Sequence, residues 1–173
     1  MNILDKFKAI KTFIFDMDGV LTDGSLLILN DSEWFRKMDI KDGYAMHVAA
    51  NHGYRMVVIS GSTSEPSKKR LYHLGVKDVF MGVTDKKELL QKYIAEQKLN
   101  QLEILYMGDD IPDYDSMEVV GLSCCPADAV NELKQIVQYI SPFNGGQGCV
   151  RDVIEKVLKL HGNWPLHSHT PAV

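Results

Sequence analysis

The chain has 173 residues, of which 45% are hydrophobic and 24% are charged, which is typical of one globular domain with a single core. Its net charge is -4, and without a basic cluster we expect no nucleic-acid partner. The longest apolar runs are far shorter than the roughly 20 residues that span a bilayer, so we expect no membrane partner either. The amino terminus lacks the apolar run of a secretory signal, and the three cysteines form no disulfide framework. We therefore expect a cytoplasmic protein.

The first part of the chain contains a buried strand, a hairpin and a helix. Residues 12–15 are a short apolar run and are predicted to form the first core strand. Residues 26–29 and 34–38 flank a polar Asn30-Asp31-Ser32 turn, which predicts a hairpin that projects from the sheet. Residues 42–52 are predicted to form a helix that ends before Gly53.

The same alternation of strands and helices continues to residue 160. Residues 55–59 are predicted to form a second core strand, and residues 66–74 a helix with Pro66 in its first turn. The elements predicted after it are a short strand at 79–81, a helix that begins near Lys86, a strand at 104–107, and helices around 130–137 and 153–158.

This order of elements predicts an α/β fold with a Rossmann-like parallel sheet, helices on both faces and a projecting β-hairpin. The hairpin, one helix and one strand fill most of the span from Asp18 to Ser60, so we expect no inserted cap domain. We predict a single domain over residues 1–160 and a mobile carboxyl-terminal tail over residues 161–173.

Polar side chains follow the predicted strands at the points where these strands end. The first strand is followed by Asp16-Met17-Asp18-Gly19, the second by Ser60-Gly61 and the fourth by Gly108-Asp109-Asp110, while Lys86 begins the helix after the third. Ligands of open α/β sheets bind at the carboxyl ends of the strands. The sequence therefore predicts one site that gathers carboxylates, a hydroxyl and an ammonium group.

Carboxylates brought this close together need a cation between them. Two unit charges about 4 Å apart repel by about 4 kcal/mol at an effective dielectric constant near 20. A site that offers only oxygen ligands suits Mg²⁺, and the absence of histidine and cysteine from these segments argues against zinc. We therefore expect Mg²⁺ as the cofactor.

Phosphoryl transfer is the chemistry that fits these residues best. Lys86 and Ser60 can hold the non-bridging oxygens of a phosphate ester, and the cation offsets the repulsion between the ester and a carboxylate. Asp16 can then attack phosphorus to form an aspartyl phosphate. Asp18, two residues further along, can protonate the leaving group and later activate water.

These motifs, together with Asp113, resemble the four ordered motifs of the haloacid dehalogenase superfamily. The resemblance covers nearly the whole chain and implies that Asp16 is the nucleophile and Asp18 the general acid and base. It also implies a metal site made of Asp16, the main-chain carbonyl of Asp18, and Asp109. Asp110 and Asp113 would then not bind the metal themselves but would orient the residues that do.

Single residues of the set allow simpler interpretations. Ser60 could cap a turn, and Asp113 could cap the segment after it. Lys87 competes with Lys86 for the position in the site. The order of all four motifs at strand ends favours the functional interpretation of the set.

A narrower resemblance connects the chain to the capless 3-deoxy-D-manno-octulosonate 8-phosphate phosphatases and to their relatives that act on nine-carbon, sialic-type sugar acid phosphates. It rests on the segment 39–44 and on Gly145-Gly146-x-Gly148 followed by Val150-Arg151. It implies a homotetramer, a role in lipopolysaccharide biosynthesis and a sugar-acid phosphate as substrate. The residues it implies near the substrate are Gly61, Lys41, Asp42 and Arg151.

One position departs from this family. Many of the octulosonate phosphatases have arginine directly after the Ser/Thr-Gly of the second motif, whereas this chain has Ser62. Arg70, further along the following helix, is a candidate to replace the missing cation.

Other classes of protein share part of the pattern. A receiver-type signalling domain also uses clustered aspartates, a hydroxyl residue, a lysine and Mg²⁺, but in that family the lysine follows the hydroxyl residue on the final strand. Here Lys86 precedes Asp109 and Asp110, and the Asp-x-Asp motif comes first. A phosphomutase would need a cap to retain its intermediate, and a catalytically silent subunit would not need both carboxylates.

Overall fold

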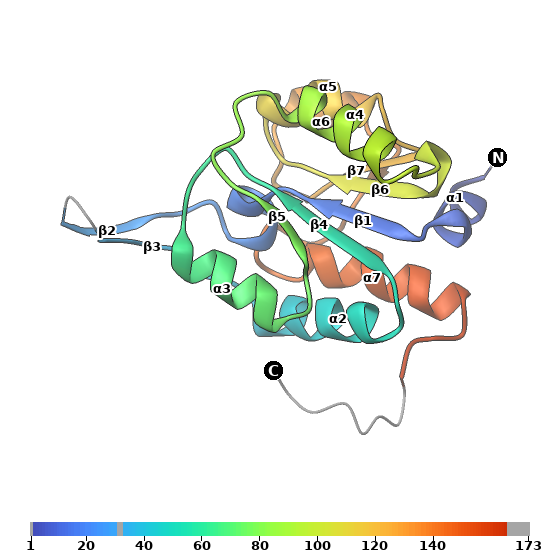
Figure 1. The fold of residues 1–173 in the computed structure, drawn as a ribbon, viewed down its shortest axis with the longest axis horizontal. Coiled ribbons are helices and arrows are strands. Elements are labelled where there is room, and N and C mark those ends of the chain that lie inside the picture. Colours follow the sequence, from blue (N-terminus) through green and yellow to red (C-terminus); the bar gives the residue numbers. More distant parts are fainter. Residues whose placement is uncertain (1, 31–32, 166–173) are drawn as a thin grey trace.

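The core of the protein is a six-stranded parallel sheet. The computed structural model describes residues 2–30 and 33–165 (Figure 1). The strands lie in the order β5-β4-β1-β6-β7-β8, and every neighbouring pair is parallel. Their bounds are β1 Thr12–Phe15, β4 Arg55–Ile59, β5 Asp78–Phe80, β6 Ile104–Met107, β7 Leu122–Cys125 and β8 Tyr139–Ile140. The predicted α/β fold with a parallel sheet is confirmed.

Helices cover both faces of this sheet, as Figure 1 shows. Their bounds are α1 Ile3–Ala9, α2 Ile40–Asn51, α3 Glu65–His73, α4 Lys86–Glu96, α5 Tyr114–Met117, α6 Asn131–Ile136 and α7 Cys149–Leu160. Side chains of α1, α2, α3 and α7 form one hydrophobic cluster, and those of α4, α5 and α6 form a second one on the opposite face. Because both faces are covered, the central strands β1 and β6 are buried along their whole length.

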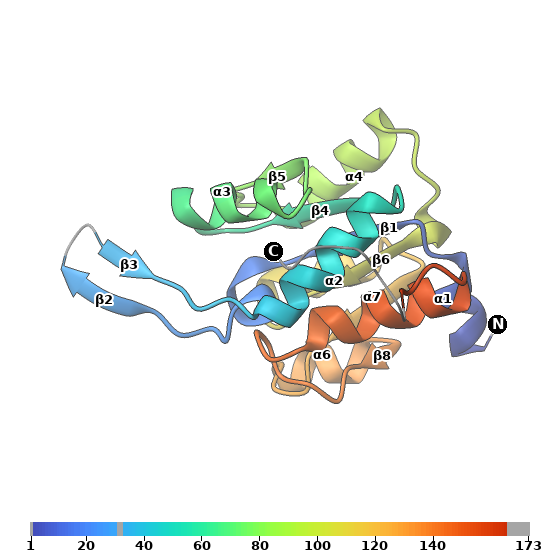
Figure 2. The ribbon, with the colours of Figure 1, turned by 90° about the horizontal axis from the view of Figure 1, so that it is seen from below.

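The predicted hairpin is present and stands apart from this layered body. β2 (Leu27–Asn30) and β3 (Glu33–Phe35) pair antiparallel with each other and with no strand of the main sheet. Both views show the hairpin of β2 and β3 projecting away from the sheet (Figures 1 and 2). Between Asp18 and Ser60 the described residues form the rest of a helical turn over Met17–Leu21, the hairpin, α2 and β4, which leaves no cap domain there.

Several details differ from the sequence prediction. The strands at 12–15, 55–59 and 104–107 have the predicted bounds. The prediction did not include α1, whose first turn is closed by a capping box between Asn2 and Asp5. It also named neither β7 nor β8, and β8 has only two residues and therefore carries no periodic pattern. Helix α2 begins two residues earlier than predicted because the Asp39 side chain accepts hydrogen bonds from Lys41 and Asp42.

The segment after α7 begins with contacts to the body of the protein. His161 shares a 2.5 Å hydrogen bond with the Tyr54 hydroxyl, and its other ring nitrogen lies 2.7 Å from the Lys8 carbonyl oxygen. Trp164 packs edge-on against Tyr44. Residues 166–173 of the predicted tail lie outside the described residues. No described helix is both long enough and apolar enough to cross a bilayer.

Asp42 joins α2 to the start of α7. Its carboxylate is buried and accepts hydrogen bonds from the main-chain amides of Gly148 (3.2 Å) and Arg151 (2.7 Å). Gly148, which precedes α7, has a φ of 110° and offers no side chain to cap the helix. Asp42 therefore satisfies amides at the first turn of α7 that the helix leaves free.

We expect Asp42→Ala to lower the free energy of unfolding by about 1–2 kcal/mol, because two partly buried amides lose their acceptor. Urea denaturation of the variant and the natural chain measures this difference. Glu96→Ala, which removes an exposed carboxylate from the end of α4, is the matched control and should leave the stability within about 0.5 kcal/mol. Equal stability of Asp42→Ala and the natural chain would contradict the capping role.

Candidate active site

The candidate site lies at the carboxyl ends of three neighbouring strands. β4, β1 and β6 are adjacent in the sheet, and they deliver Ser60, Asp16 and Asp109 respectively. These side chains line one hollow together with Asp18, Gly61 and Lys86. The motifs that are distant in the chain therefore meet at this edge of the sheet, as the sequence predicts.

A tight turn after β1 shapes the first motif. The Asp16 side chain accepts a 2.6 Å hydrogen bond from the amide of Met17, and the Thr22 amide donates to the Met17 carbonyl. Gly19 within the turn has a φ of 87°, and a Cβ at this position would overlap the Asp109 carboxylate. Glycine is therefore required both for the backbone conformation and for the close approach of the two motifs.

The glycine-rich segment near α7 supports this turn from behind. The Gly146 amide donates a 2.9 Å hydrogen bond to the Val20 carbonyl. A Cβ on Gly145 would overlap the carbonyl of Gly19, so the two backbones lie in direct contact. The segment that resembled part of the phosphatase family thus contacts the first motif of its own chain.

Three carboxylates and one ammonium group form the centre of the site. Carboxylate oxygens of Asp16, Asp109 and Asp113 all lie within 4.8 Å of one another. The Lys86 ammonium lies 2.9 Å from Asp16 Oδ1 and 2.8 Å from Asp113 Oδ1. Asp16 and Lys86 are only 7% and 6% exposed, so these charges interact with little screening by solvent.

The structure distinguishes between the two candidate lysines. Lys86 points into the site, whereas the Lys87 ammonium lies 3.6 Å from Glu118 on the surface. Both are in the first turn of α4, where neighbouring residues face different directions. The Asp85 side chain caps the helix through the Glu88 amide and thereby fixes where the first turn begins.

Asp113 contributes to the site and does not act as a helix cap. Its carboxylate accepts hydrogen bonds from Lys86, from the Tyr106 hydroxyl at 2.6 Å and from the Asp109 amide at 3.3 Å. It makes no capping hydrogen bond to α5. Gly108 permits this arrangement because a Cβ there would overlap the Asp113 side chain.

Burial and, after it, the excess of negative charge raise the pKa values of two carboxylates in the cluster. Burial and then the charge of Asp113 raise the pKa of Asp16 to about 8. Burial followed by the charges of Asp113 and Asp110 raises the pKa of Asp109 to about 7. Burial lowers the pKa of Lys86, but the charges of Asp113 and Asp16 outweigh this effect and raise it. One ammonium group therefore does not neutralise the three carboxylates.

This donor set fits a hard divalent cation. All three candidate ligands are oxygen donors, and no histidine or cysteine joins the cluster within the described residues. Mg²⁺ prefers such ligands, and its charge would remove the repulsion that raises the pKa values of Asp16 and Asp109. The prediction had named Asp16, the Asp18 main chain and Asp109. The structure brings Asp16 and Asp109 together with Asp113.

The Asp18 carboxylate points away from this cluster toward the hairpin side of the site. Arg36, which follows β3, places Nε 2.6 Å from Asp18 Oδ1 and a terminal nitrogen 3.3 Å from Oδ2. The Ser62 hydroxyl donates a 2.7 Å hydrogen bond to Oδ2. Sequence reasoning did not identify Arg36, because no motif marks it and its direction depends on how the hairpin leaves the sheet.

Ser60 and Asp110 have local roles as well as a place in the site. The Ser60 hydroxyl accepts a 3.2 Å hydrogen bond from the Ser62 amide and lies 3.0 Å from the Ser62 hydroxyl. Asp110 is exposed and accepts a hydrogen bond from the Ile111 amide, which begins the short turn toward Asp113. Both residues nevertheless line the hollow that contains Asp16.

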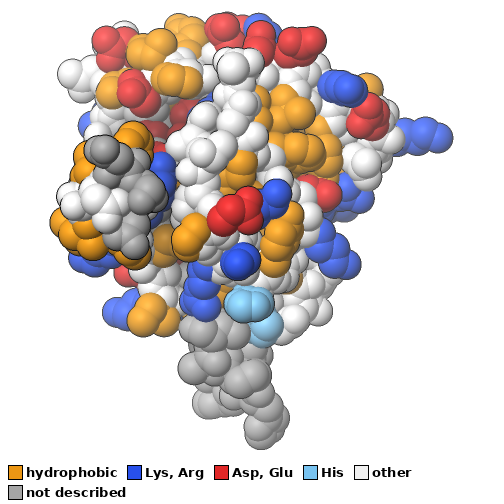
Figure 3. Space-filling view, turned by 60° about the vertical axis from the view of Figure 1, so that its left-hand side comes forward, with side chains coloured by type: hydrophobic (Ala, Val, Ile, Leu, Met, Phe, Trp, Pro, Cys, Tyr) orange, Lys and Arg blue, Asp and Glu red, His pale blue; other side chains and the backbone are white. Residues whose placement is uncertain are grey.

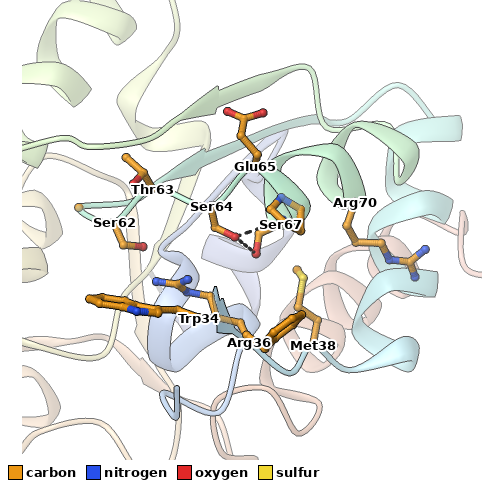
Figure 4. Close-up of a pocket in the computed structure, with 12 residues that line it drawn as sticks. Trp34, Arg36, Met38, Ser62, Thr63, Ser64, Glu65, Ser67 and Arg70 are labelled. Atoms are coloured by element: carbon orange, nitrogen blue, oxygen red, sulfur yellow. Dashed lines mark hydrogen bonds between the residues drawn. The ribbon is translucent and has the colours of Figure 1, made fainter. Parts of the chain in front are cut away.

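The remaining predicted substrate residues lie outside the acidic cluster. Arg70 lines a larger neighbouring hollow of about 970 Å³ between the hairpin and α3, which also contains Arg36 and Ser62 (Figure 4). Lys41 and Arg151 line a separate hollow beside α7, where Arg151 pairs with Glu155 at 2.9 Å. The Asp42 carboxylate is turned to the amides of α7, as described above, and lines neither of these hollows nor the acidic site.

Comparison with known proteins gives a consistent result. Residues 71–154 match the haloacid dehalogenase-like hydrolase family. The 3-deoxy-D-manno-octulosonate 8-phosphate phosphatase KdsC of Salmonella typhi is 29% identical over 161 residues, which cover 93% of this chain and 86% of that protein.

Solved structures agree with this relationship over nearly the whole chain. The crystal structure of a probable YrbI family phosphatase from Pseudomonas syringae has a TM-score of 0.89 and 33% identity, and covers 92% of this chain and 91% of that one. The 3-deoxy-D-manno-octulosonate 8-phosphate phosphatase of Moraxella catarrhalis, solved with magnesium, phosphate and KDO, has a TM-score of 0.89 and 27% identity, with coverages of 93% and 92%. The chain is therefore a phosphoric monoester hydrolase that belongs to the haloacid dehalogenase-like hydrolases, in the family of YrbI-type phosphatases.

Proposed function

We propose that this protein is a Mg²⁺-dependent phosphatase that hydrolyses 3-deoxy-D-manno-octulosonate 8-phosphate in lipopolysaccharide biosynthesis. The observation that supports it most strongly is the buried Asp16 carboxylate, which lies against Lys86 and beside Asp109 and Asp113. The names of the relatives described above support the choice of substrate. The three described cysteines are buried free thiols, which supports a location in the reducing cytoplasm.

In the first half of the reaction, Asp16 is the nucleophile. One oxygen of its carboxylate attacks phosphorus, and the bond between phosphorus and the sugar oxygen breaks. Asp18 donates a proton to that sugar oxygen, so that the sugar leaves as a neutral alcohol. The products of this step are an aspartyl phosphate at position 16 and an ionised Asp18.

In the second half, water releases the phosphate. A water molecule attacks the phosphorus of the aspartyl phosphate and gives its proton to Asp18. The bond between phosphorus and Asp16 breaks, which restores the Asp16 carboxylate and the protonated Asp18. Both residues therefore return to their starting states after each turnover.

The surrounding residues offset the negative charge of the phosphoryl group. Lys86 can contact a phosphoryl oxygen at Asp16 while Asp113 holds its ammonium group in place. Ser60 offers a hydroxyl from the end of β4. Mg²⁺ held by Asp16 and Asp109, when bound, supplies positive charge that reduces the repulsion between the phosphate dianion and the carboxylates.

A nine-carbon sialic-type sugar acid 9-phosphate is the second candidate substrate. The observation that favours it is Ser62, which stands where many octulosonate phosphatases have arginine and which contacts Asp18 here. The hollow beside it contains Arg70 together with several hydroxyl groups, and can hold an acidic sugar.

A panel of phosphosugars tests the proposed substrate. With Mg²⁺ present, we expect kcat/KM for the octulosonate 8-phosphate to exceed that for hexose 6-phosphates by at least about a hundredfold, because only the acid sugar can pair with Arg70. Phosphate release measured at steady state gives these values. Faster turnover of hexose phosphates would contradict the substrate, and a preference for the nine-carbon acid would favour the second candidate.

Asp16→Asn tests the proposed nucleophile. It preserves the shape of the side chain but removes the nucleophile, so we expect kcat to fall by at least about 10⁴-fold on every substrate of the panel. A variant that retained activity would contradict covalent catalysis by Asp16.

Magnesium affinity should depend on pH. The pKa values of Asp16 and Asp109 are raised to about 8 and about 7 in the metal-free protein, so binding must displace protons at neutral pH. We expect the dissociation constant of Mg²⁺, measured by calorimetry, to fall by at least about tenfold between about pH 6 and about pH 8.

The same shifts affect stability in a defined direction. Both pKa values lie above those of the unfolded chain, so the folded metal-free protein binds more protons, and its free energy of unfolding falls as pH rises from about 4 toward about 8. Mg²⁺ should therefore raise the melting temperature more at about pH 8 than at about pH 6. A magnesium affinity that is constant over this range would contradict the protonated cluster.

We also propose that the protein forms a homotetramer in which the hairpin packs on a neighbouring copy. Leu27 and Ile28 are each 61% exposed, and their cross-strand partners Phe35 and Trp34 are also exposed. Figure 3 shows hydrophobic side chains around the hairpin at the left of the view. Opposite pairs lie on alternate faces of the ribbon, so both faces are apolar and favour a cover from another chain.

Sedimentation of a hairpin variant tests this assembly. We expect Leu27→Glu to shift the protein toward monomers, because it places a charge in an apolar contact. Leu102→Glu, the same change at a leucine that is 67% exposed far from the hairpin, should leave the assembly unchanged. A natural chain that sediments as a fully active monomer would contradict the proposal.

A further inference from the structure

We propose that Arg36 is a positioning residue for the general acid and base of this enzyme: it holds the Asp18 carboxylate most closely at Oδ1, and the more loosely held Oδ2 carries the catalytic proton. This inference rests on the proposed function, since it assigns a role in the same reaction. It concerns a residue of the hairpin that no motif includes.

The contact between Arg36 and Asp18 is shielded on the arginine side and well directed. The Arg36 side chain is 6% exposed, although it follows the exposed end of β3. Its Nε lies 2.6 Å from Oδ1, and its terminal nitrogen lies 3.3 Å from Oδ2. A planar guanidinium that contacts a carboxylate at two points fixes both its position and its orientation.

The two oxygens of Asp18 have different partners. The short contact on Oδ1 comes from Arg36, which can only donate hydrogen bonds and keeps its charge throughout. The short contact on Oδ2 comes from the Ser62 hydroxyl at 2.7 Å, which can rotate to donate or to accept. A proton on Oδ1 would face the Arg36 donor at 2.6 Å, whereas on Oδ2 the Arg36 contact is longer, at 3.3 Å, and a proton there can face the Ser62 oxygen as acceptor.

A second hydroxyl extends this adaptable side. The Ser62 hydroxyl also lies 3.0 Å from the Ser60 hydroxyl, and either of the two can be the donor. When Asp18 is ionised, Ser62 donates to Oδ2. When Asp18 is protonated, Ser62 can accept from Oδ2 and donate to Ser60. The two serine hydroxyls can therefore switch between donating and accepting when Asp18 gains or loses a proton, whereas Arg36 can only donate.

The location of Arg36 connects this arrangement to the hairpin. Arg36 and Ser62 approach Asp18 from two segments of the chain, and Figure 4 shows both residues at the same hollow, Arg36 from the hairpin side and Ser62 from the segment before α3. Removal of Arg36 would leave Asp18 in place on its turn but free to rotate. The expected defect is in the rate of the chemical steps and not in substrate binding.

The test compares Arg36→Gln with the natural chain on two substrates. p-Nitrophenyl phosphate carries no carboxylate and has a leaving group that departs without a proton, whereas the octulosonate phosphate requires one. We expect kcat to fall by at least about tenfold on both. KM for the octulosonate phosphate should stay within about twofold, whereas KM for p-nitrophenyl phosphate should fall with kcat because the aspartyl phosphate accumulates. With p-nitrophenyl phosphate, attack by Asp16 stays fast while hydrolysis of the aspartyl phosphate slows, so the variant should show a burst of p-nitrophenolate close to one per site.

Further variants distinguish the loss of the Asp18 contact from the loss of a positive charge or of correct folding. Lys37→Gln removes the neighbouring exposed cation and should leave both kcat values unchanged. Arg36→Lys, which can anchor Oδ1 with one contact, should recover part of the lost kcat. Ser62→Ala changes the Oδ2 side without altering the hairpin, and it should also lower kcat and give a burst even if Arg36→Gln folds poorly.

Two results would overturn the assignment. If Arg36→Gln and Ser62→Ala keep the natural kcat on both substrates, neither residue positions Asp18. If Arg36→Gln only raises KM for the octulosonate phosphate and leaves p-nitrophenyl phosphate unaffected, Arg36 binds the substrate carboxylate instead. A natural chain that releases no phosphate from either substrate would instead contradict the proposed function itself.

Discussion

The ion pairs of Lys86 with Asp16 and Asp113 are the interaction on which the rest of the site depends. They connect the end of β1, the start of α4 and the turn after β6 through contacts of 2.9 and 2.8 Å. Burial makes this arrangement costly unless every charge is compensated. Three carboxylates beside one ammonium group leave that compensation incomplete, which is why the cluster favours a divalent cation. The charge of this cation would also reduce the repulsion that an anionic substrate meets at the site.

The fold supplies this cluster by placing adjacent parallel strands side by side. β4, β1 and β6 end at the same edge, and glycines at positions 19, 108 and 145 allow the following turns to pack without side chains between them. Asp18 faces a second environment, made by Arg36 and Ser62. Asp16 and Asp18, the proposed nucleophile and the proposed general acid and base, are thus two residues apart in sequence but have different electrostatic surroundings.

Sequence patterns predict the parts of this structure that depend on local signals. Buried apolar runs define β1, β4 and β6, and the residues after them are Asp16, Ser60 and Asp109, so the centre of the site follows from the strand ends. The long-range contacts could not be predicted in this way. Arg36 reaches Asp18 only because of the direction of the hairpin, and Asp42 caps a helix more than a hundred residues away. Neither contact leaves a periodic pattern or a motif.

Trapping the phosphorylated enzyme tests the central claim most directly. After rapid acid quench during turnover with Mg²⁺, mass spectrometry of the peptides should show one phosphoryl group on Asp16, labile to hydroxylamine, and none in Asp16→Asn. Turnover without any phosphorylated peptide, or phosphorylation of a residue other than Asp16, would contradict the claim that the acidic cluster makes Asp16 the acceptor of the phosphoryl group.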